Sequence, residues 1–215
     1  MKINRQRRFC AASCVPDWDE DSPALAENLT AALRLCRDAA IARKAPSREL
    51  PRAWQIRTLE ALDVPDPAYV GAFRGEKGLE TCNVRIGFAF GTDAGLVLEE
   101  LSAFEQTLTK AVAALDALIP AGQLPANEDQ LNAVIELCAW THAEWVRIHP
   151  FANGNGRTAR LWTAFIAMRY GIPPFVTLRP RPGDPYAAAC AAAMTGDWMP
   201  TASTFRQMYL DAVAV

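Results

Sequence analysis

The residues best suited to chemistry lie together in one twelve-residue stretch, positions 149–160, which reads HPFANGNGRTAR. His149 supplies an imidazole, whose ordinary pKa of about 6.5 suits a proton acceptor near neutral pH. Two closely spaced glycines allow a tight turn with accessible backbone N–H groups. Arg157 and Arg160 would be neighbours on a helix, and two guanidinium groups match the geometry of phosphate oxygens. The stretch therefore predicts a polyphosphate site with a general base at its edge.

The backbone of this stretch is expected to end one helix and begin another. Pro150 pushes the residue before it out of the helical region, and the next helix is expected to begin near Asn155. The start of a helix carries unpaired N–H donors and the positive end of the helix dipole, so it attracts anions. A helix–turn–helix corner with surface arginines is the plainer alternative. A dinucleotide-binding fingerprint is disfavoured, because it needs a preceding strand and an acidic residue roughly 20 positions later.

Apolar periodicity predicts a mainly α-helical protein around this stretch, since apolar residues recur at steps of three and four. Helices are expected at residues 22–42, 47–62, 97–119, 131–146 and from about 155 to 168, followed by two shorter ones. Residues 71–78 are rich in turn formers, and residues 82–90 alternate apolar and polar types, which predicts a small β-hairpin. An isolated hairpin is barely stable, so it must pack on the helical body or pair with a partner strand.

Composition and charge exclude several classes of function. The 215 residues include 22 basic and 24 acidic ones, and a net charge of −2 disfavours binding to a nucleic-acid backbone. No window approaches the ~20 apolar residues that span a bilayer, so no membrane association is expected. Six cysteines and only two histidines supply a zinc site poorly, and we expect reduced thiols in a cytoplasmic protein. Residues 1–21 are expected to form a flexible N-terminus.

The twelve-residue stretch resembles the signature of the Fic domain family, His-x-Phe-x-Asp/Glu-Gly-Asn-Gly/Lys-Arg-x-x-Arg. Every defined position matches except Asn153, which stands where the family usually has an acid. Residues 141–148 resemble the segment that usually precedes this signature, and residues 73–90 resemble the hairpin known as the flap in Fic proteins. The resemblance covers residues 70–210 and implies a Fic-type helical bundle with a small β-hairpin flap.

The resemblance implies a role for each residue of the signature. His149 would take a proton from a Ser, Thr or Tyr hydroxyl of a target protein. The anion hole and the contacts to the outer phosphates would come from Gly154, Asn155, Gly156, Arg157 and Arg160. Fic enzymes of this signature use ATP as the donor, transfer AMP and release pyrophosphate. The resemblance therefore implies a protein adenylyltransferase whose partners are ATP and a target protein.

Asn153 bears on the metal that the family uses. The family acid coordinates Mg²⁺, whereas an asparagine carbonyl offers an oxygen without a charge. Three outcomes stay open: Asn153 binds Mg²⁺ or Mn²⁺ weakly beside the phosphates, the enzyme uses another metal or donor, or the site binds nucleotide with little turnover. The alternatives to an adenylyltransferase are therefore a nucleotide-binding regulatory module and Fic-type transfer of a different phosphate-containing group.

A candidate regulatory residue lies upstream, where many Fic proteins carry an inhibitory helix with Ser/Thr-x-x-x-Glu-Gly/Asn. Glu27 is followed by Asn28, but Pro23 occupies the Ser/Thr position. The resemblance implies that Glu27 would pair with Arg160 and block the productive triphosphate pose, whereas a solvated helix residue is the plainer alternative. Control by self-inhibition or by a separate antitoxin is possible. The chain then divides into the N-terminus (1–21), N-terminal helices with the candidate inhibitory helix (22–65) and a Fic core (66–215).

Overall fold

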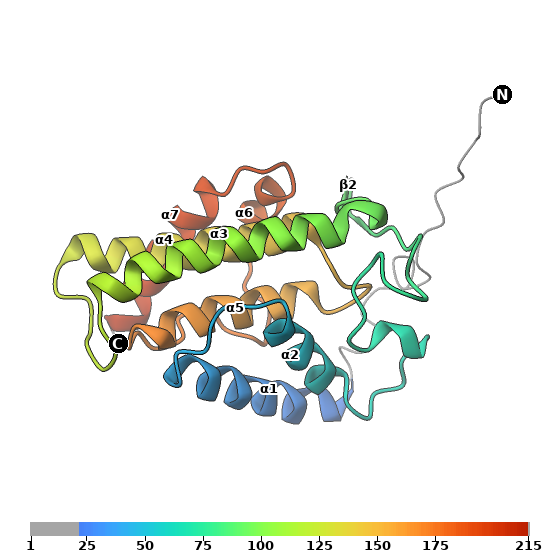
Figure 1. Ribbon diagram of the computed structural model, residues 1–215, viewed down its shortest axis with the longest axis horizontal. Coiled ribbons are helices and arrows are strands. Elements are labelled where there is room, and N and C mark those ends of the chain that lie inside the picture. Colours follow the sequence, from blue (N-terminus) through green and yellow to red (C-terminus); the bar gives the residue numbers. More distant parts are fainter. Residues whose placement is uncertain (1–21, 215) are drawn as a thin grey trace.

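Residues 22–214 are described by the computed structural model, and helices dominate this part of the chain (Figure 1). The predicted N-terminus at residues 1–21 lies outside the described residues. The helices are α1 (Pro23–Ile41), α2 (Glu49–Leu59), α3 (Val97–Leu118), α4 (Glu128–Ile148), α5 (Asn155–Arg169), α6 (Tyr186–Ala193) and α7 (Met199–Val213), with short 3-10 turns at Pro67–Tyr69 and Ala94–Leu96. The mainly α-helical fold class is thereby confirmed.

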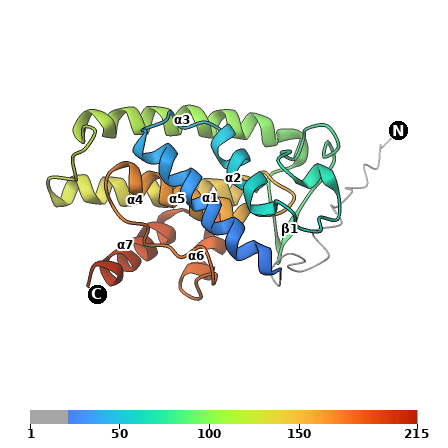
Figure 2. The same cartoon turned by 90° about the horizontal axis from the view of Figure 1, so that it is seen from below.

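Helix α5 lies at the centre of the bundle, between the α3–α4 pair and the α1–α2 pair (Figures 1 and 2). It packs against α4, α1 and α2, and most of its side chains are buried. A helix that is buried on all sides is fixed by its neighbours, whatever its intrinsic helical propensity. The first turn of α5, which carries the predicted phosphate-binding arginines, is therefore held in place by the core.

An aromatic cluster fills the space between these helices. Trp162 of α5 lies 5.1 Å from Trp54, 5.8 Å from Phe104 and 6.0 Å from Trp145, measured between ring centroids. Trp54, Trp145 and Trp162 are at most 1% exposed. Each such ring buries a large apolar area, of roughly 150–250 Å². The tryptophans beside the signature therefore stabilise the core and are closed to a nucleotide base.

The predicted hairpin is present, but its strands are shorter than predicted. Strands β1 (Arg85–Ile86) and β2 (Ala89–Phe90) pair antiparallel around Gly87, which adopts a positive φ of 57°. The preceding residues do not extend the strand, because Cys82 and Val84 are buried in a second, smaller core. The other members of that core are Tyr69, Leu79 and Ala152. Much of the alternation in the sequence thus reflects packing against the body of the protein.

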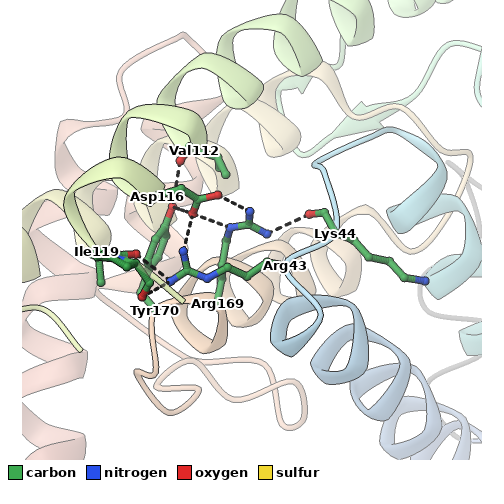
Figure 3. Close-up of polar contacts among 8 residues, drawn as sticks. Arg43, Lys44, Val112, Asp116, Ile119, Arg169 and Tyr170 are labelled. Atoms are coloured by element: carbon green, nitrogen blue, oxygen red, sulfur yellow. Dashed lines mark hydrogen bonds and ion pairs between the residues drawn. The ribbon is translucent and has the colours of Figure 1, made fainter. Parts of the chain in front are cut away.

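A polar clasp joins α1, α3 and α5 at the end of α5 that lies away from the signature (Figure 3). Asp116 of α3 accepts hydrogen bonds from Arg43, Arg169 and Tyr170. Arg169 also donates to the carbonyl of Lys44 at 2.9 Å. Burial raises the pKa of Asp116, but the hydrogen bonds and charge of Arg169 outweigh this effect and hold the pKa below its usual value. The clasp is a structural feature, remote from the candidate site.

The cysteines correct one prediction. Cys36, Cys138 and Cys190 are free, and burial raises the pKa of each thiol, so these three are inert. Cys82 is disulfide-bonded. The expectation that every thiol is reduced is therefore wrong at Cys82, and cysteine usage no longer supports a cytoplasmic location. Among residues 22–214, no helix has both the length and the apolar content that a bilayer crossing requires.

Candidate active site

The turn between α4 and α5 places His149 in an unusual backbone conformation. His149 is the C-cap of α4 and adopts left-handed angles, φ 53° and ψ 57°. Pro150 follows and has no N–H, so the carbonyl of Val146 lacks its usual helical donor. The Nδ1 atom of His149 lies 3.1 Å from that carbonyl oxygen. Because a carbonyl can only accept, Nδ1 carries the hydrogen, and Nε2 keeps the lone pair that a general base needs.

The surroundings of His149 keep its ring neutral. Burial lowers the pKa of His149 to about 4, the hydrogen bond with Val146 opposes this effect, and the charge of Arg74 adds to it. The imidazole is therefore unprotonated at neutral pH and is ready to accept a proton. A base of this low pKa is a weak acceptor, so its effect depends on being held close to the hydroxyl it serves.

The loop of the signature is closed by its own asparagine. Asn155 accepts a hydrogen bond from the N–H of Phe151 and donates one to the carbonyl of the same residue, both at 2.8 Å. Gly154 precedes α5 with φ 90°, a conformation that favours glycine. The first backbone bond of α5 runs from Thr158 to Gly154 at 2.9 Å. Gly156 therefore lies in the first turn of α5, at the end of the helix where backbone amides and the helix dipole favour an anion.

Arg157 lies on this first turn and is 6% exposed. Its Nη2 atom donates to Oδ1 of Asn153 at 2.5 Å. The oxygen that would replace the family's metal ligand is thus already engaged by a guanidinium. Groups of three or more His, Cys, Asp or Glu side chains suited to a metal are absent among residues 22–214. The described residues therefore fit a divalent cation poorly, because they offer it one neutral oxygen that is in use.

Arg160 lies one turn further along α5 and is 5% exposed. It donates to the carbonyl of Leu178 at 3.0 Å and to the hydroxyl of Tyr186 at 3.4 Å. Within the described part of the chain its Nε atom has no partner. Both arginines are therefore nearly buried beside the anion-binding end of α5. A guanidinium in such a place is strongly attracted to phosphate, because water screens it little.

His142 belongs to the core. It is fully buried, and its Nε2 atom lies 2.9 Å from the Tyr186 hydroxyl. Burial lowers its pKa to about 3, and the charges of Arg160 and Arg181 add to this effect. His142 is thus linked to the site through Tyr186, whose hydroxyl also accepts from Arg160.

Two side chains that sequence reasoning missed hold the signature loop from outside. Gln55 of α2 donates to the carbonyls of Tyr69 and Asn153, and it accepts from the N–H of Gly71. Arg74 donates to backbone carbonyls at the end of α4. Neither residue stands out in the sequence, because an isolated glutamine and an arginine in a turn-rich segment are ordinary surface residues in most proteins.

The structure does not bring Glu27 to the site. Glu27 is exposed on α1, and no ion pair found among residues 22–214 includes it. The next residue, Asn28, faces inward and donates to the carbonyls of Thr58 and Glu60 at 3.2 and 2.7 Å. The predicted contact between Glu27 and Arg160 is therefore absent here, because the helical phase of α1 points Asn28 to α2. An inhibitory role for Glu27 stays a prediction.

The fold and the site together define a helical-bundle protein with an anion-binding helix start and a neutral histidine beside it. Residues 83–167 match the family model described as the Fic/DOC family. The chain therefore contains a Fic/DOC-family region, and the resemblance found in the sequence is confirmed. This region runs from within the flap segment to the last turn of α5 and includes every site residue predicted from the sequence except Glu27.

Comparisons with known proteins agree with this assignment. The protein adenylyltransferase fic-1 of Caenorhabditis briggsae is 46% identical over 76 residues, which cover 34% of this chain and 15% of that protein. A Fic domain containing signaling protein from Bacteroides thetaiotaomicron has a similar fold, with a TM-score of 0.62, 20% identity, and 88% of this chain and 70% of that chain covered. Fic-1 (aa134–508) of C. elegans has a TM-score of 0.57 and 25% identity, with 87% and 50% covered.

The shared stretches are short relative to the relatives. The chain matches between 12% and 15% of the length of the first three curated relatives. These three relatives are named protein adenylyltransferases. The Fic/DOC match over residues 83–167 and the fold are therefore shared with these proteins, and the reaction of this chain is a matter for proposal.

Proposed function

We propose that this chain is a protein adenylyltransferase that transfers AMP from ATP to a Ser, Thr or Tyr hydroxyl of a target protein. The observation that carries the proposal is the pairing of two features at one corner. His149 is neutral with Nε2 unprotonated, and two nearly buried arginines lie at the N-terminal end of α5. The first feature suits proton removal and the second suits a polyphosphate.

The proposed reaction moves one proton and exchanges one phosphorus–oxygen bond. The target hydroxyl oxygen forms a bond to the α-phosphorus, and the bond from that phosphorus to the leaving oxygen breaks. Nε2 of His149 accepts the hydroxyl proton, and the electron pair of the broken bond leaves with pyrophosphate. The amides of α5, Arg157 and Arg160 stabilise the charge that develops on the phosphate oxygens. Nδ1–H of His149 stays with Val146, which keeps the ring oriented during the step.

A second function is favoured by one observation at the metal position. Asn153 carries no charge, and its oxygen accepts from Arg157. A chain with this substitution could bind nucleotide at α5 and turn it over slowly, as a regulatory module. We assign no step to Mg²⁺ or Mn²⁺, because the described donor set fits a divalent cation poorly.

Incubation with ATP labelled at the α-phosphate and a cell lysate, with Mg²⁺ or Mn²⁺, tests the proposal. Labelled protein bands are expected from the wild type. His149→Ala should reduce labelling by ~10²–10⁴, the usual contribution of a general base, while ATP still binds. Mass spectrometry of the labelled band should show an added AMP. Nucleotide binding without labelling in either metal would favour the regulatory module, and equal labelling by His149→Ala would refute the role of His149.

A further inference from the structure

Arg74 is a fully buried arginine at the base of the flap segment, defined as residues 71–91. In Figure 1 this teal-to-green segment lies at the end of the bundle where α4 turns into α5. The hydrogen bonds of its guanidinium go to three backbone carbonyls: His149 at 2.7 Å, Ile148 at 2.9 Å and Cys82 at 3.2 Å. Burial lowers the pKa of Arg74 to about 10, and the charge of Asp93 partly opposes this effect. A buried cation whose N–H donors bind backbone carbonyls fixes the position of the backbone.

Those carbonyls need donors because α4 ends there. The last carbonyls of a helix have no amide partner within it, and Pro150 provides no N–H nearby. Arg74 supplies the missing donors to two of them, and its own N–H donates to the carbonyl of Pro150 at 2.7 Å. Three consecutive carbonyls, at residues 148–150, are thus held by one residue. A cation at the C-terminus of a helix is also favoured by the helix dipole.

The three carbonyls that Arg74 binds flank His149, which adopts a left-handed conformation that non-glycine residues seldom adopt. Without bound carbonyls on either side, the chain could relax at His149, and the ring would lose its contact with Val146. Arg74 therefore acts on the direction of the imidazole, although it does not touch the ring nitrogens.

The flap closes over the same place. Gly91 donates to the carbonyl of Val84 at 3.3 Å, which brings the two ends of the hairpin together. A Cβ atom at Gly91 would lie 2.7 Å from Cβ of His149 and 3.0 Å from Nη2 of Arg74. The flap backbone thus packs directly on His149, and no side chain fits between them. Arg74 bonds to both parts, since it reaches Cys82 in the flap segment and residues 148–150 in the signature.

We propose that Arg74 is a positioning residue for the transfer step: it locks the backbone of His149 and the base of the flap into one unit. A target segment that docks on the flap then meets Nε2 of His149 at a fixed distance. This inference rests on the proposed function, because it assigns Arg74 a role in that reaction. The competing role is stabilisation of the fold alone.

The test compares Arg74→Met with Arg169→Met. Arg169 is the matched control, because it is also a buried arginine that donates to a backbone carbonyl, and it belongs to the remote clasp in Figure 3. Arg74→Met should lower the transfer rate at saturating ATP by ~10²-fold, the scale of a small misplacement of a reacting group, and leave the Kd for ATP within about threefold. Arg169→Met should lose thermal stability but transfer at nearly the wild-type rate. Arg74→Lys, which keeps the charge, should restore part of the rate.

Two outcomes would overturn the inference: wild-type transfer by a folded Arg74→Met, or an equal loss of transfer in both methionine variants. If Arg74→Met does not fold, Gly91→Ala probes the same unit from the flap side. The added methyl group should displace His149 and reduce transfer while ATP binding persists, and normal transfer by that variant would equally refute the proposal.

A second readout does not depend on activity. The chain has two histidines, so ¹⁵N-histidine NMR resolves each imidazole. In the wild type and in Arg169→Met, His149 should show one tautomer with hydrogen on Nδ1, whereas Arg74→Met should show a mixture. If the wild type labels nothing, the proposed function fails while the NMR comparison still decides whether Arg74 orients His149. An unchanged tautomer in Arg74→Met would refute the positioning role.

Discussion

Acidification from pH 8 to pH 5 is expected to destabilise the fold through its two histidines. His142 is fully buried, and burial together with the charges of Arg160 and Arg181 lowers its pKa to about 3. Burial and the charge of Arg74 lower the pKa of His149 to about 4. Both values lie below the ordinary histidine pKa of 6.5. Between pH 6.5 and pH 5 the unfolded chain therefore binds two protons, one on each histidine, that the folded chain does not bind.

The magnitude follows from the size of that window. Stability is unaffected above pH 6.5, where both states are neutral, and it falls as the pH drops below 6.5 because the unfolded state binds more protons. Over the roughly 1.5 units from pH 6.5 to pH 5, at about 1.4 kcal/mol per unit, His142 contributes a loss of about 2 kcal/mol. His149 is only half-buried, so solvent screening makes the same figure an upper limit for it. Glu76 contributes little in this window, because its ordinary pKa of 4.5 and its pKa in the folded chain, which the hydrogen bond from Arg52 lowers, both lie below pH 5.

The assay is urea unfolding at pH 8, 6.5 and 5 for the wild type, His142→Gln and His149→Gln. Glutamine keeps a polar group at each position but does not titrate, so each variant should lose less stability on acidification than the wild type does. The comparison uses the change with pH, so any loss that a variant shows at pH 8 cancels. If His142→Gln loses as much stability as the wild type between pH 6.5 and pH 5, the buried neutral His142 is not the cause and the reasoning fails.

Three further predictions concern the metal position, the clasp and the flap. Asn153→Asp should raise Mg²⁺-dependent labelling several-fold, because a carboxylate can bind Mg²⁺ while it also accepts the hydrogen bond from Arg157. A titration of the labelling rate against Mg²⁺ checks this, and a fall in the rate would contradict it. Asp116→Ala should lower the free energy of unfolding, measured in urea, by about 3 kcal/mol, because it leaves the buried guanidinium of Arg169 without its carboxylate partner. ATP binding should be unchanged. Phe88→Ser should reduce target labelling at unchanged Kd for ATP, because Phe88 is fully exposed at the hairpin tip; unchanged labelling would exclude the tip from target docking.

Local pattern was enough to predict most of the helices. The helix predicted at residues 97–119 is observed at Val97–Leu118, and the one predicted at 22–42 is observed at Pro23–Ile41. The helix predicted at 131–146 is longer in the structure, Glu128–Ile148. Its first turn is polar and is capped by Asn127, so no apolar residue there marked the start of the helix. A helix of this length repeats its buried face several times, so the period is visible within one contiguous segment. The candidate site was visible for the same reason, since its base, glycines and arginines lie within twelve residues.

The tertiary structure decided what surrounds those twelve residues. Arg74 meets His149 across 75 positions and Gln55 meets Asn153 across 98, so no spacing in the sequence marks either contact. The direction of the Glu27 side chain also depended on packing. The apolar periodicity of a single helix does not show which of two neighbouring polar residues faces the site. The sequence by itself determined the chemical groups that the α4–α5 turn presents. Only the folded chain determined their protonation and orientation, because burial and backbone carbonyls from distant segments set both.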